Sequence, residues 1–302
     1  MSRSVVAPNS GPPEKLATVV AAVRQASRLL MHYFHGAHAD LEVETKADES
    51  PVSKADKESN ALLVRALTQL FPDTPVVSEE DDMPSAALRA HWTRCLLVDP
   101  LDGTKEFLRG SKDFAVNVAL VELGRPVWGV MACPALDVVV VGGPALGAWI
   151  AFPRDTPTQM PTSPSAEPLQ PITLWQRLKS PEPPEPTRLR AVLSQSHRHG
   201  SEQPALDRFG VDSVVRRGSS LKFLLVARGE ADVYFRRTPT WEWDTAAGQA
   251  ILEGLACVVC DLRGEPLLYN RPDTLNGPFL ACPRVILESC LERVQRAFQE
   301  GP

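Results

Sequence analysis

A short stretch, residues 98–110, gathers the side chains of this chain that are best suited to chemistry. It reads VDPLDGTKEFLRG and follows an apolar run. Asp99 and Asp102 stand three residues apart across a turn, and two carboxylates held that close repel each other unless a cation lies between them. Gly103 leaves room beside the backbone, and a helix beginning at about Thr104 would offer free N–H groups to an anion. The stretch therefore suits a phosphate ester that is held by metal ions.

Further acids lie at the ends of other predicted elements. Glu79 and Glu80 follow a short buried strand, and Asp244 opens a predicted helix. Strand ends and helix N-termini line clefts in layered α/β proteins, so these acids can meet the two aspartates. Oxygen ligands favour Mg²⁺ or Mn²⁺ over Zn²⁺, and two or more such ions would keep the acids from repelling a phosphate. Each residue alone also has a simpler interpretation, because Asp-Pro and Asp-Gly are common turn pairs and Asp commonly caps a helix.

The elements that must position these residues alternate between helices and strands. Apolar spacing predicts a helix over 14–35 that ends at Gly36, and a second over 54–70 that Ser53 caps. Strands are expected at 74–81, 94–100, 114–122, 127–132, 138–141, 148–152, 190–197 and 231–236. Further helices are expected at 219–229, at 244–255 beginning with Asp244, and at 285–298. This order indicates a mixed α and β architecture in two lobes.

Proline content divides the chain. Residues 153–186 are rich in Pro, Ser and Thr, which predicts a linker or surface insertion with little core of its own. This segment separates an N-terminal α+β lobe at 14–152, which holds the metal site, from a C-terminal α/β lobe at 187–302, which holds the substrate-binding residues. Residues 1–13 lack an apolar signal core and are predicted to be a disordered lead-in.

Composition excludes several classes of protein. The 302 residues can bury a large core, and their net charge of −5 argues against non-specific binding of nucleic acid. No apolar run reaches the roughly 18 residues of a transmembrane helix. Six cysteines without a disulfide rhythm indicate the cytoplasm, and Cys257 and Cys260 are expected to be buried thiols rather than half of a zinc site. Composition leaves open a peripheral membrane association and the choice between a monomer and a homodimer.

Three motifs in one order carry a family resemblance. VVSEED at 76–81, VDPLDGTKEFL at 98–108 and WDTAAG at 243–248 resemble the signature of a superfamily of metal-dependent, lithium-sensitive phosphatases. That superfamily includes inositol monophosphatases, fructose-1,6-bisphosphatases and 3'(2'),5'-bisphosphate nucleotidases. With the flanks TKADESPVSKAD, LSQSH and GSSLKF, the chain is most similar to the CysQ-type bisphosphate nucleotidases, over about 14–152 and 187–283. The resemblance implies the layered αβαβα sandwich of inositol monophosphatase and fructose-1,6-bisphosphatase, an α+β fold in two lobes.

The resemblance also implies a role for each matching residue. Two or three Mg²⁺ ions, or Mn²⁺ in their place, would be bound by Glu79, Asp99, Asp102, Asp244 and the backbone carbonyl of Leu101. Asp56 and Thr104 would orient and help deprotonate the attacking water, and Glu79 would share in catalysis. Substrate contacts would come from Gly103, Thr104, Lys105, His197, Ser219, Ser220, Lys222 and Arg236. The loop 45–56 would be a mobile flap that brings Asp56 to the site.

The implied activity is hydrolysis of adenosine 3',5'-bisphosphate to AMP and phosphate by a metal-activated water, a reaction of sulfur metabolism that Li⁺ inhibits. A second expected substrate is 3'-phosphoadenylyl sulfate. Lys105 favours the nucleotide because inositol monophosphatases usually carry another residue there, and the guanidinium of Arg236 suits a second phosphate because it can bind two oxygens. The alternatives are an inositol monophosphatase or sugar phosphatase of the same superfamily, and a catalytically silent nucleotide-binding sensor.

Overall fold

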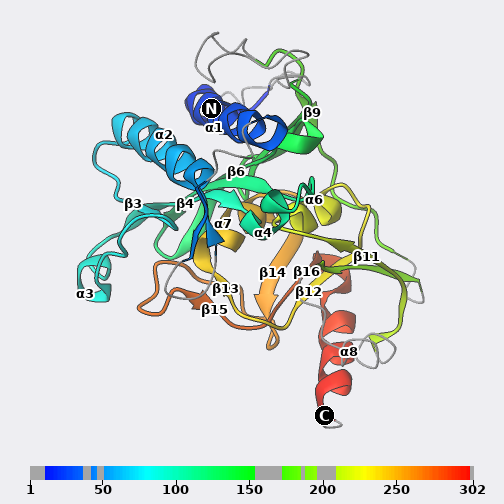
Figure 1. Cartoon of the computed structure of the whole chain (residues 1–302). Coiled ribbons are helices and arrows are strands. Elements are labelled where there is room, and N and C mark those ends of the chain that lie inside the picture. Colours follow the sequence, from blue (N-terminus) through cyan, green and yellow to red (C-terminus); the bar gives the residue numbers. More distant parts are fainter. Residues whose placement is uncertain are drawn as a thin grey trace, which may run out of the picture.

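Helices and sheets alternate in layers in a computed structural model of the chain, which describes residues 11–36, 42–45, 51–153, 172–184, 188–195 and 209–299 (Figure 1). Helices α1 (Glu14–His35) and α2 (Lys54–Leu70) cover one face of a seven-stranded sheet. Helices α6 (Leu221–Ala227) and α7 (Glu242–Glu253) lie between this sheet and a five-stranded sheet. Helix α8 (Leu287–Gln299) packs on the far face of the second sheet. The predicted α+β fold, a layered αβαβα sandwich, is confirmed.

The seven-stranded sheet contains the predicted site residues Asp99 and Asp102, which lie in its strand β4. Its strands are, in spatial order, β3 (Val76–Ser78), β4 (Arg94–Asp102), β5 (Ala115–Glu122), β6 (Arg125–Cys133), β7 (Val138–Gly143), β8 (Gly147–Ala151) and β9 (Gln176–Arg177). β3 and β4 run parallel, and the other neighbouring pairs are antiparallel. Side chains alternate along β4: Leu96 faces the core under α1 and α2, and Leu97 faces α6 and α7. The sheet is therefore buried on both faces.

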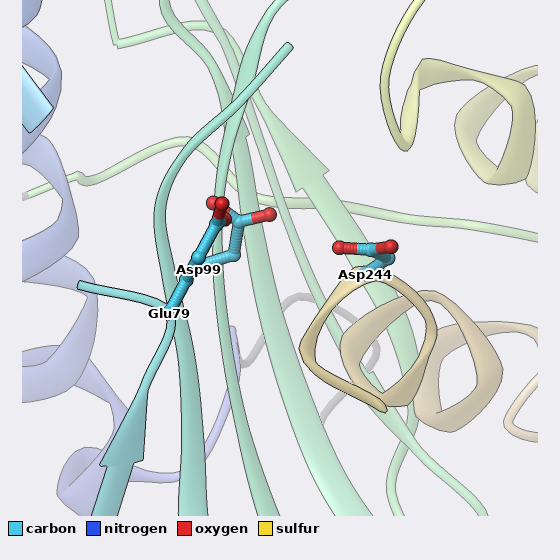
Figure 2. A group of neighbouring side chains, drawn as sticks. All are labelled: Glu79, Asp99 and Asp244. Atoms are coloured by element: carbon cyan, nitrogen blue, oxygen red, sulfur yellow. The ribbon is translucent and has the colours of Figure 1, made fainter. Parts of the chain in front are cut away.

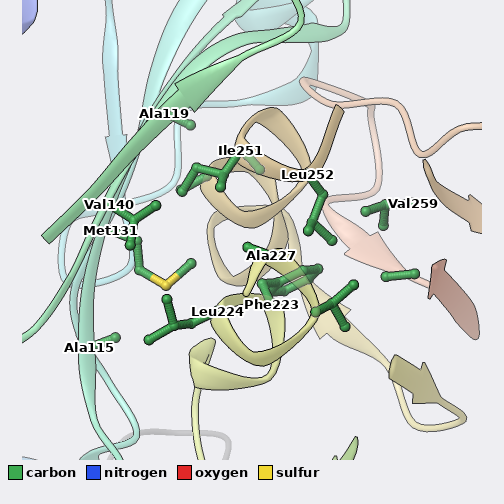
Figure 3. Packing of buried hydrophobic residues seen from close by; sticks show 14 of the residues in the cluster. Ala115, Ala119, Met131, Val140, Phe223, Leu224, Ala227, Ile251, Leu252 and Val259 are labelled. Carbon is green, nitrogen blue, oxygen red and sulfur yellow. The ribbon is translucent and has the colours of Figure 1, made fainter. Parts of the chain in front are cut away.

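The five-stranded sheet comes from the second half of the chain. Its strands are, in spatial order, β11 (Val211–Arg217), β10 (Leu189–Ser194), β12 (Val233–Arg236), β16 (Phe279–Pro283) and β14 (Cys257–Asp261). Figure 3 shows side chains of α6 and α7, such as Phe223 and Leu252, between Met131 of the first sheet and Val259 of the second. Both halves of the chain thus contribute to one central core.

Short elements complete the described chain. They are β1 (Glu44–Thr45), β2 (Pro51–Val52), α3 (Ala86–Arg89), α4 (Thr104–Leu108), η2 (Pro134–Leu136), β13 (Thr240–Trp241), β15 (Leu275–Asn276) and η3 (Arg284–Ile286). Within the described ranges, no helix combines the length and the apolar character that a membrane crossing requires. All six cysteines are free and buried, as expected for Cys257 and Cys260.

Most predicted elements are confirmed, with a few differences. The helices expected at 14–35 and 54–70 are α1 and α2. Helix α7 begins at Glu242 rather than at Asp244, because the Asp244 carboxylate reaches back to cap the helix from inside its first turn. Two residues of the proline-rich segment, Gln176 and Arg177, form the edge strand β9 beside β8. Of the predicted lead-in, residues 1–10 lie outside the described ranges.

Candidate active site

Three carboxylates converge where β3, β4 and α7 meet. Glu79 directly follows β3, Asp99 lies in β4, and Asp244 lies in the first turn of α7. One oxygen from each lies within 4.8 Å of the others. The parallel pairing of β3 with β4 continues through a bond from the Glu79 N–H to the Val98 carbonyl (3.2 Å), which brings the first two acids side by side. Figure 2 shows Asp244 facing them across a gap.

This acidic group is electrostatically strained. Asp99 is 1% exposed; its Oδ1 accepts the Leu101 N–H (3.1 Å), and its Oδ2 is buried with no hydrogen-bond partner in the part of the chain that the structure describes. Burial, and then the charges of Glu79 and Asp102, raise the pKa of Asp99 well above its usual range. Burial, and then the charges of Asp102 and Glu79, raise the pKa of Asp244 in the same way. A divalent cation would relieve this repulsion, so the group fits a metal site.

Asp102 lies at the same cleft but is tied to the second half of the chain. Its Oδ2 accepts the Ser220 N–H (2.5 Å) and lies 3.4 Å from the Asn117 Nδ2. The Ser220 hydroxyl in turn donates to the Asn117 Oδ1 (3.0 Å). A bulge in β4 between Asp99 and Asp102 turns this carboxylate toward α6. One oxygen of Asp102 is therefore fixed by the protein, and Asp102 is not among the three acids whose oxygens lie within 4.8 Å of one another.

Asn117 is a site residue that sequence reasoning did not identify. It is buried in β5 and pairs with Asp99 in the sheet register. The signal was present, because Asn117 is the polar residue inside the apolar run AVNVALV. A buried amide in such a strand needs partners for its hydrogen-bonding atoms, and here the partners belong to the acidic site.

Asp56 is fixed to Thr104 from a neighbouring helix. The Thr104 hydroxyl lies 2.9 Å from Asp56 Oδ1 and 3.3 Å from the Leu101 carbonyl. The other oxygen, Asp56 Oδ2, accepts the Ser53 N–H (2.8 Å) and hydroxyl (2.5 Å) in the capping box of α2. Asp56 thus lies in the first turn of the capped helix that was predicted over 54–70. That helix overlaps the end of the loop predicted over 45–56, and residues 46–50 of this loop lie outside the described ranges.

Gly103 brings the acidic loop against the second half of the chain. Its φ of 93° lies in the left-handed region that favours glycine. An added Cβ would stand 2.9 Å from the Asp113 carbonyl and 3.2 Å from the Ser219 side chain. Helix α4 begins at Thr104, as predicted. Only glycine lets the backbone pass here, with the first turn of α4 opening onto the cleft.

Basic side chains face the acids across the cleft. Lys222 is buried, its Nζ donates to the Ser219 carbonyl, and burial lowers its pKa to about 8. Its Nζ also lies 5.4 Å from the centre of the Tyr234 ring. Arg236 is half-buried at the end of β12, and its Nε donates to the Thr238 carbonyl (3.2 Å). These cations can balance an anion that the carboxylates alone would repel.

The structure brings the predicted site residues together. Every one of them in the described ranges lines a single cleft of about 240 Å³, apart from Asp56, which reaches it through Thr104. Lys105 is exposed at the cleft, and the Ser219 Oγ is buried with no hydrogen-bond partner among the described residues. Ser220 lines the cleft, but its N–H and its hydroxyl are engaged by Asp102 and Asn117. His197 lies outside the described ranges.

Comparison with known proteins bears on the family of this chain. The model of the inositol monophosphatase family matches residues 13–299. The 3'(2'),5'-bisphosphate nucleotidase CysQ of Escherichia coli O157:H7 is 35% identical over 260 residues, which cover 86% of this chain and 96% of that protein. The protein of the same name from Salmonella typhimurium is 36% identical over 263 residues, covering 87% of this chain and 97% of that one.

Solved structures show the same fold. CysQ from Bacteroides thetaiotaomicron, a bacterial member of the inositol monophosphatase family, superposes with a TM-score of 0.70 at 31% identity, covering 89% of this chain and 97% of that one. The Thermotoga maritima IMPase superposes with a TM-score of 0.73 at 20% identity, covering 95% and 99%. Since the family match extends over nearly the whole sequence and the sequence relatives exceed 30% identity over most of both chains, the chain belongs to the inositol monophosphatase family.

Proposed function

We propose that the protein is a magnesium-dependent 3'(2'),5'-bisphosphate nucleotidase that hydrolyses adenosine 3',5'-bisphosphate to AMP and phosphate. The observation that carries the proposal is one cleft in which three mutually repelling carboxylates face a buried lysine and an arginine. The acids suit cations that bind one phosphate, and the basic side chains suit a second phosphate. The activity named for relatives at 35% and 36% identity supports a nucleotide as the carrier of both.

The acidic side of the cleft fits divalent cations. The unpartnered Oδ2 of Asp99 and the oxygen-only donor set suit Mg²⁺, with Mn²⁺ as a substitute. The ligands of two or three ions would be Glu79, Asp99, Asp102, Asp244 and the carbonyl of Leu101. Bound ions supply positive charge to the phosphate oxygens and lower the pKa of water.

Asp56 and Thr104 would orient the attacking water. The Thr104 hydroxyl has one proton, and Asp56 Oδ1 is its nearer acceptor at 2.9 Å. With that proton directed to Asp56, the hydroxyl oxygen accepts a hydrogen bond from the water and turns a water lone pair toward phosphorus. The water proton moves toward the Thr104–Asp56 pair as the new P–O bond forms, and the 3' oxygen leaves in line on the opposite side and takes up a proton from solvent water to become the 3' hydroxyl of AMP.

The two phosphates of the substrate would bind to different parts of the cleft. The N–H groups of Gly103 and Thr104, at the first turn of α4, would hold the phosphate that is cleaved. Lys222 and Arg236, together with the unpartnered hydroxyl of Ser219, would hold the second phosphate. A further proposed substrate is 3'-phosphoadenylyl sulfate, because its 3'-phosphate would meet the same groups. We assign the enzyme to the cytoplasm because its six cysteines are free thiols.

The test is phosphate release from adenosine 3',5'-bisphosphate, measured beside inositol 1-phosphate and fructose 1,6-bisphosphate in Mg²⁺, with and without Li⁺. We expect fast release from the nucleotide, inhibited by Li⁺. Asp102→Asn should abolish release, whereas Asp212→Asn, an exposed carboxylate of β11 outside the cleft, should not change it.

Other outcomes of the substrate panel would change the assignment. Release mainly from the inositol or sugar phosphate would make the protein a phosphatase for those compounds. Tight nucleotide binding without release from any substrate would point to a nucleotide sensor.

A further inference from the structure

Trp241 is the accessible aromatic side chain of the cleft. Three aromatic residues line the cleft in the part of the chain that the structure describes: Phe223, Tyr234 and Trp241. Phe223 is 1% and Tyr234 is 3% exposed, so both rings are packed into the protein, whereas Trp241 is half-buried. Trp241 lies three residues before Asp244 and so stands beside the acidic group. A flat apolar surface is thus available close to where the scissile phosphate would bind.

The Trp241 ring is supported from behind. It stacks on the ring of Trp243, with ring centroids 5.2 Å apart and planes inclined by 13°. The backbone is held as well: the backbone N–H of Trp241 donates to Asp244 Oδ2 (2.8 Å), and the backbone carbonyl of Trp241 accepts from the Asn276 Nδ2 (3.2 Å). Trp241 also pairs with Leu275 in the antiparallel register of β13 and β15. Because this ring is already fixed, little conformational entropy is lost when a ligand packs on it.

A nucleotide offers this surface a matching group. In a nucleoside bisphosphate, one ribose joins the two phosphates to a flat base, and every base has an aromatic face that stacks on Trp. The charged and hydroxyl groups of the cleft account for the phosphates but offer nothing apolar to a base. We propose that Trp241 is the stacking platform for the nucleobase and sets the preference for nucleotides over phosphate esters that lack an aromatic group. This inference rests on the proposed nucleotidase function.

The experiment compares two ligands that differ in the base. AMP and ribose 5-phosphate share the ribose and the phosphate, so the ratio of their affinities reports the contribution of the base. Calorimetric titrations in Mg²⁺ would use the wild type, Trp241→Leu, Trp241→Phe and the control Trp92→Leu. Trp92 is also half-buried and packs on the same core, but it does not line the cleft. Hydrolysis of adenosine 3',5'-bisphosphate is measured in parallel.

We expect the wild type to bind AMP roughly tenfold or more tightly than ribose 5-phosphate, which is the scale of one base stacked on an aromatic ring. Trp241→Leu should remove most of that ratio by weakening AMP alone, Trp241→Phe should keep part of it, and Trp92→Leu should keep all of it.

Two results would overturn the inference. They are a wild type that does not distinguish the two ligands, and a Trp241→Leu variant that keeps the ratio. If the variant keeps the ratio but binds both ligands more weakly, the ring contacts the sugar or only supports the fold. If Trp241→Leu does not fold, the ratio for Trp241→Phe decides. A wild type that does not hydrolyse the bisphosphate refutes the proposed function itself, whereas hydrolysis with an unchanged ratio refutes only the role of Trp241.

Discussion

Asp99→Asn should make the metal-free protein more stable while it removes the response to metal. The substitution preserves shape, and the carbonyl of the introduced asparagine can still accept the Leu101 N–H, as Asp99 Oδ1 does at 3.1 Å. The new amide nitrogen would take the position of Oδ2, which is buried without a partner among the described residues. The introduced amide is neutral and can donate hydrogen bonds, so the repulsion between position 99 and the carboxylates of Glu79 and Asp244 is removed.

The size of the effect follows from the spacing of the charges. The oxygens lie within 4.8 Å of one another, and two unit charges at that limit repel by about 3.5 kcal/mol at an effective dielectric constant of about 20. Asp99 takes part in two such pairs. The penalty has an upper limit, because the carboxyl can instead bind a proton. Protonating a carboxyl with the usual pKa of 3.8 at pH 7 costs about 4.4 kcal/mol, at about 1.36 kcal/mol per pH unit. The repulsion cannot cost more than this. Water screens the two partly exposed partners, so we expect the free energy of unfolding to rise by about 1 to 4 kcal/mol.

The expected stabilisation corresponds to a modest but measurable rise in Tm. An unfolding entropy of about 2.1 cal/mol/K per residue, multiplied by 302 residues, is about 0.6 kcal/mol/K, so Tm should rise by about 2 to 6 °C. The gain should grow with pH. Because the pKa of Asp99 is raised in the folded state, the metal-free wild type loses stability as pH rises from 3.8 toward that raised value. The asparagine side chain does not titrate and so avoids this loss.

The assay is scanning calorimetry in EDTA and in Mg²⁺, at about pH 6 and about pH 8. The matched control is Asp232→Asn, a buried carboxylate that, unlike Asp99, has a cationic partner, with its Oδ1 2.7 Å from the Arg190 Nη2. This control should lower Tm in both solutions, because it weakens an attraction. The reasoning would be refuted if Asp99→Asn lowered the metal-free Tm, or if Mg²⁺ stabilised the variant as much as the wild type.

Other groups at the cleft lead to separate predictions. Asn117→Ala removes a side chain that helps to hold Asp102. The Mg²⁺ concentration for half-maximal activity and the Mn²⁺ dissociation constant should therefore both rise about tenfold. An unchanged metal affinity would contradict this role of Asn117. Because burial lowers the pKa of Lys222 to about 8, kcat/KM should fall above about pH 8 as its positive charge is lost, and Lys222→Arg should abolish that inflection. Thr104→Val removes the hydroxyl that reaches Asp56 and should lower kcat by a factor of about 100 or more without changing metal affinity; a rise in KM alone would assign Thr104 to binding.

The sequence predicts the layers of the fold better than it predicts some of their strands. Periodic apolar residues reveal α1 and α2, and a continuous buried run reveals β4. The strand β11, with the sequence VDSVVRR, was not predicted, because it is an edge strand whose side chains are mostly exposed and show no alternation. It is held by parallel backbone pairing with β10, and backbone hydrogen bonding leaves no periodic signature in the sequence.

The same distinction holds within the candidate site. The acids of the loop 98–110 could be predicted, because their types and spacing are local. The link from Asp102 to Ser220 could not, because it joins residues 118 positions apart through a backbone N–H, which every residue other than proline possesses. Asn117 stands between these cases, since its burial in an apolar strand was visible in the sequence but its partners were not.

The choice between a helix cap and a functional acid, which the sequence poses for Asp244, proves not to be exclusive. Asp244 Oδ2 accepts the backbone N–H of Trp241 (2.8 Å) at the start of α7, and an oxygen of the same carboxylate lies within 4.8 Å of oxygens of Glu79 and Asp99. Asp56 divides its two oxygens in the same way, between the cap of α2 and Thr104. Because each cap fixes the rotamer of its acid, the bond that stabilises the helix also orients the carboxylate that we propose for the site. An alanine substitution at either position would therefore remove a cap and a site group together, whereas asparagine keeps an oxygen for the cap and tests the charge alone.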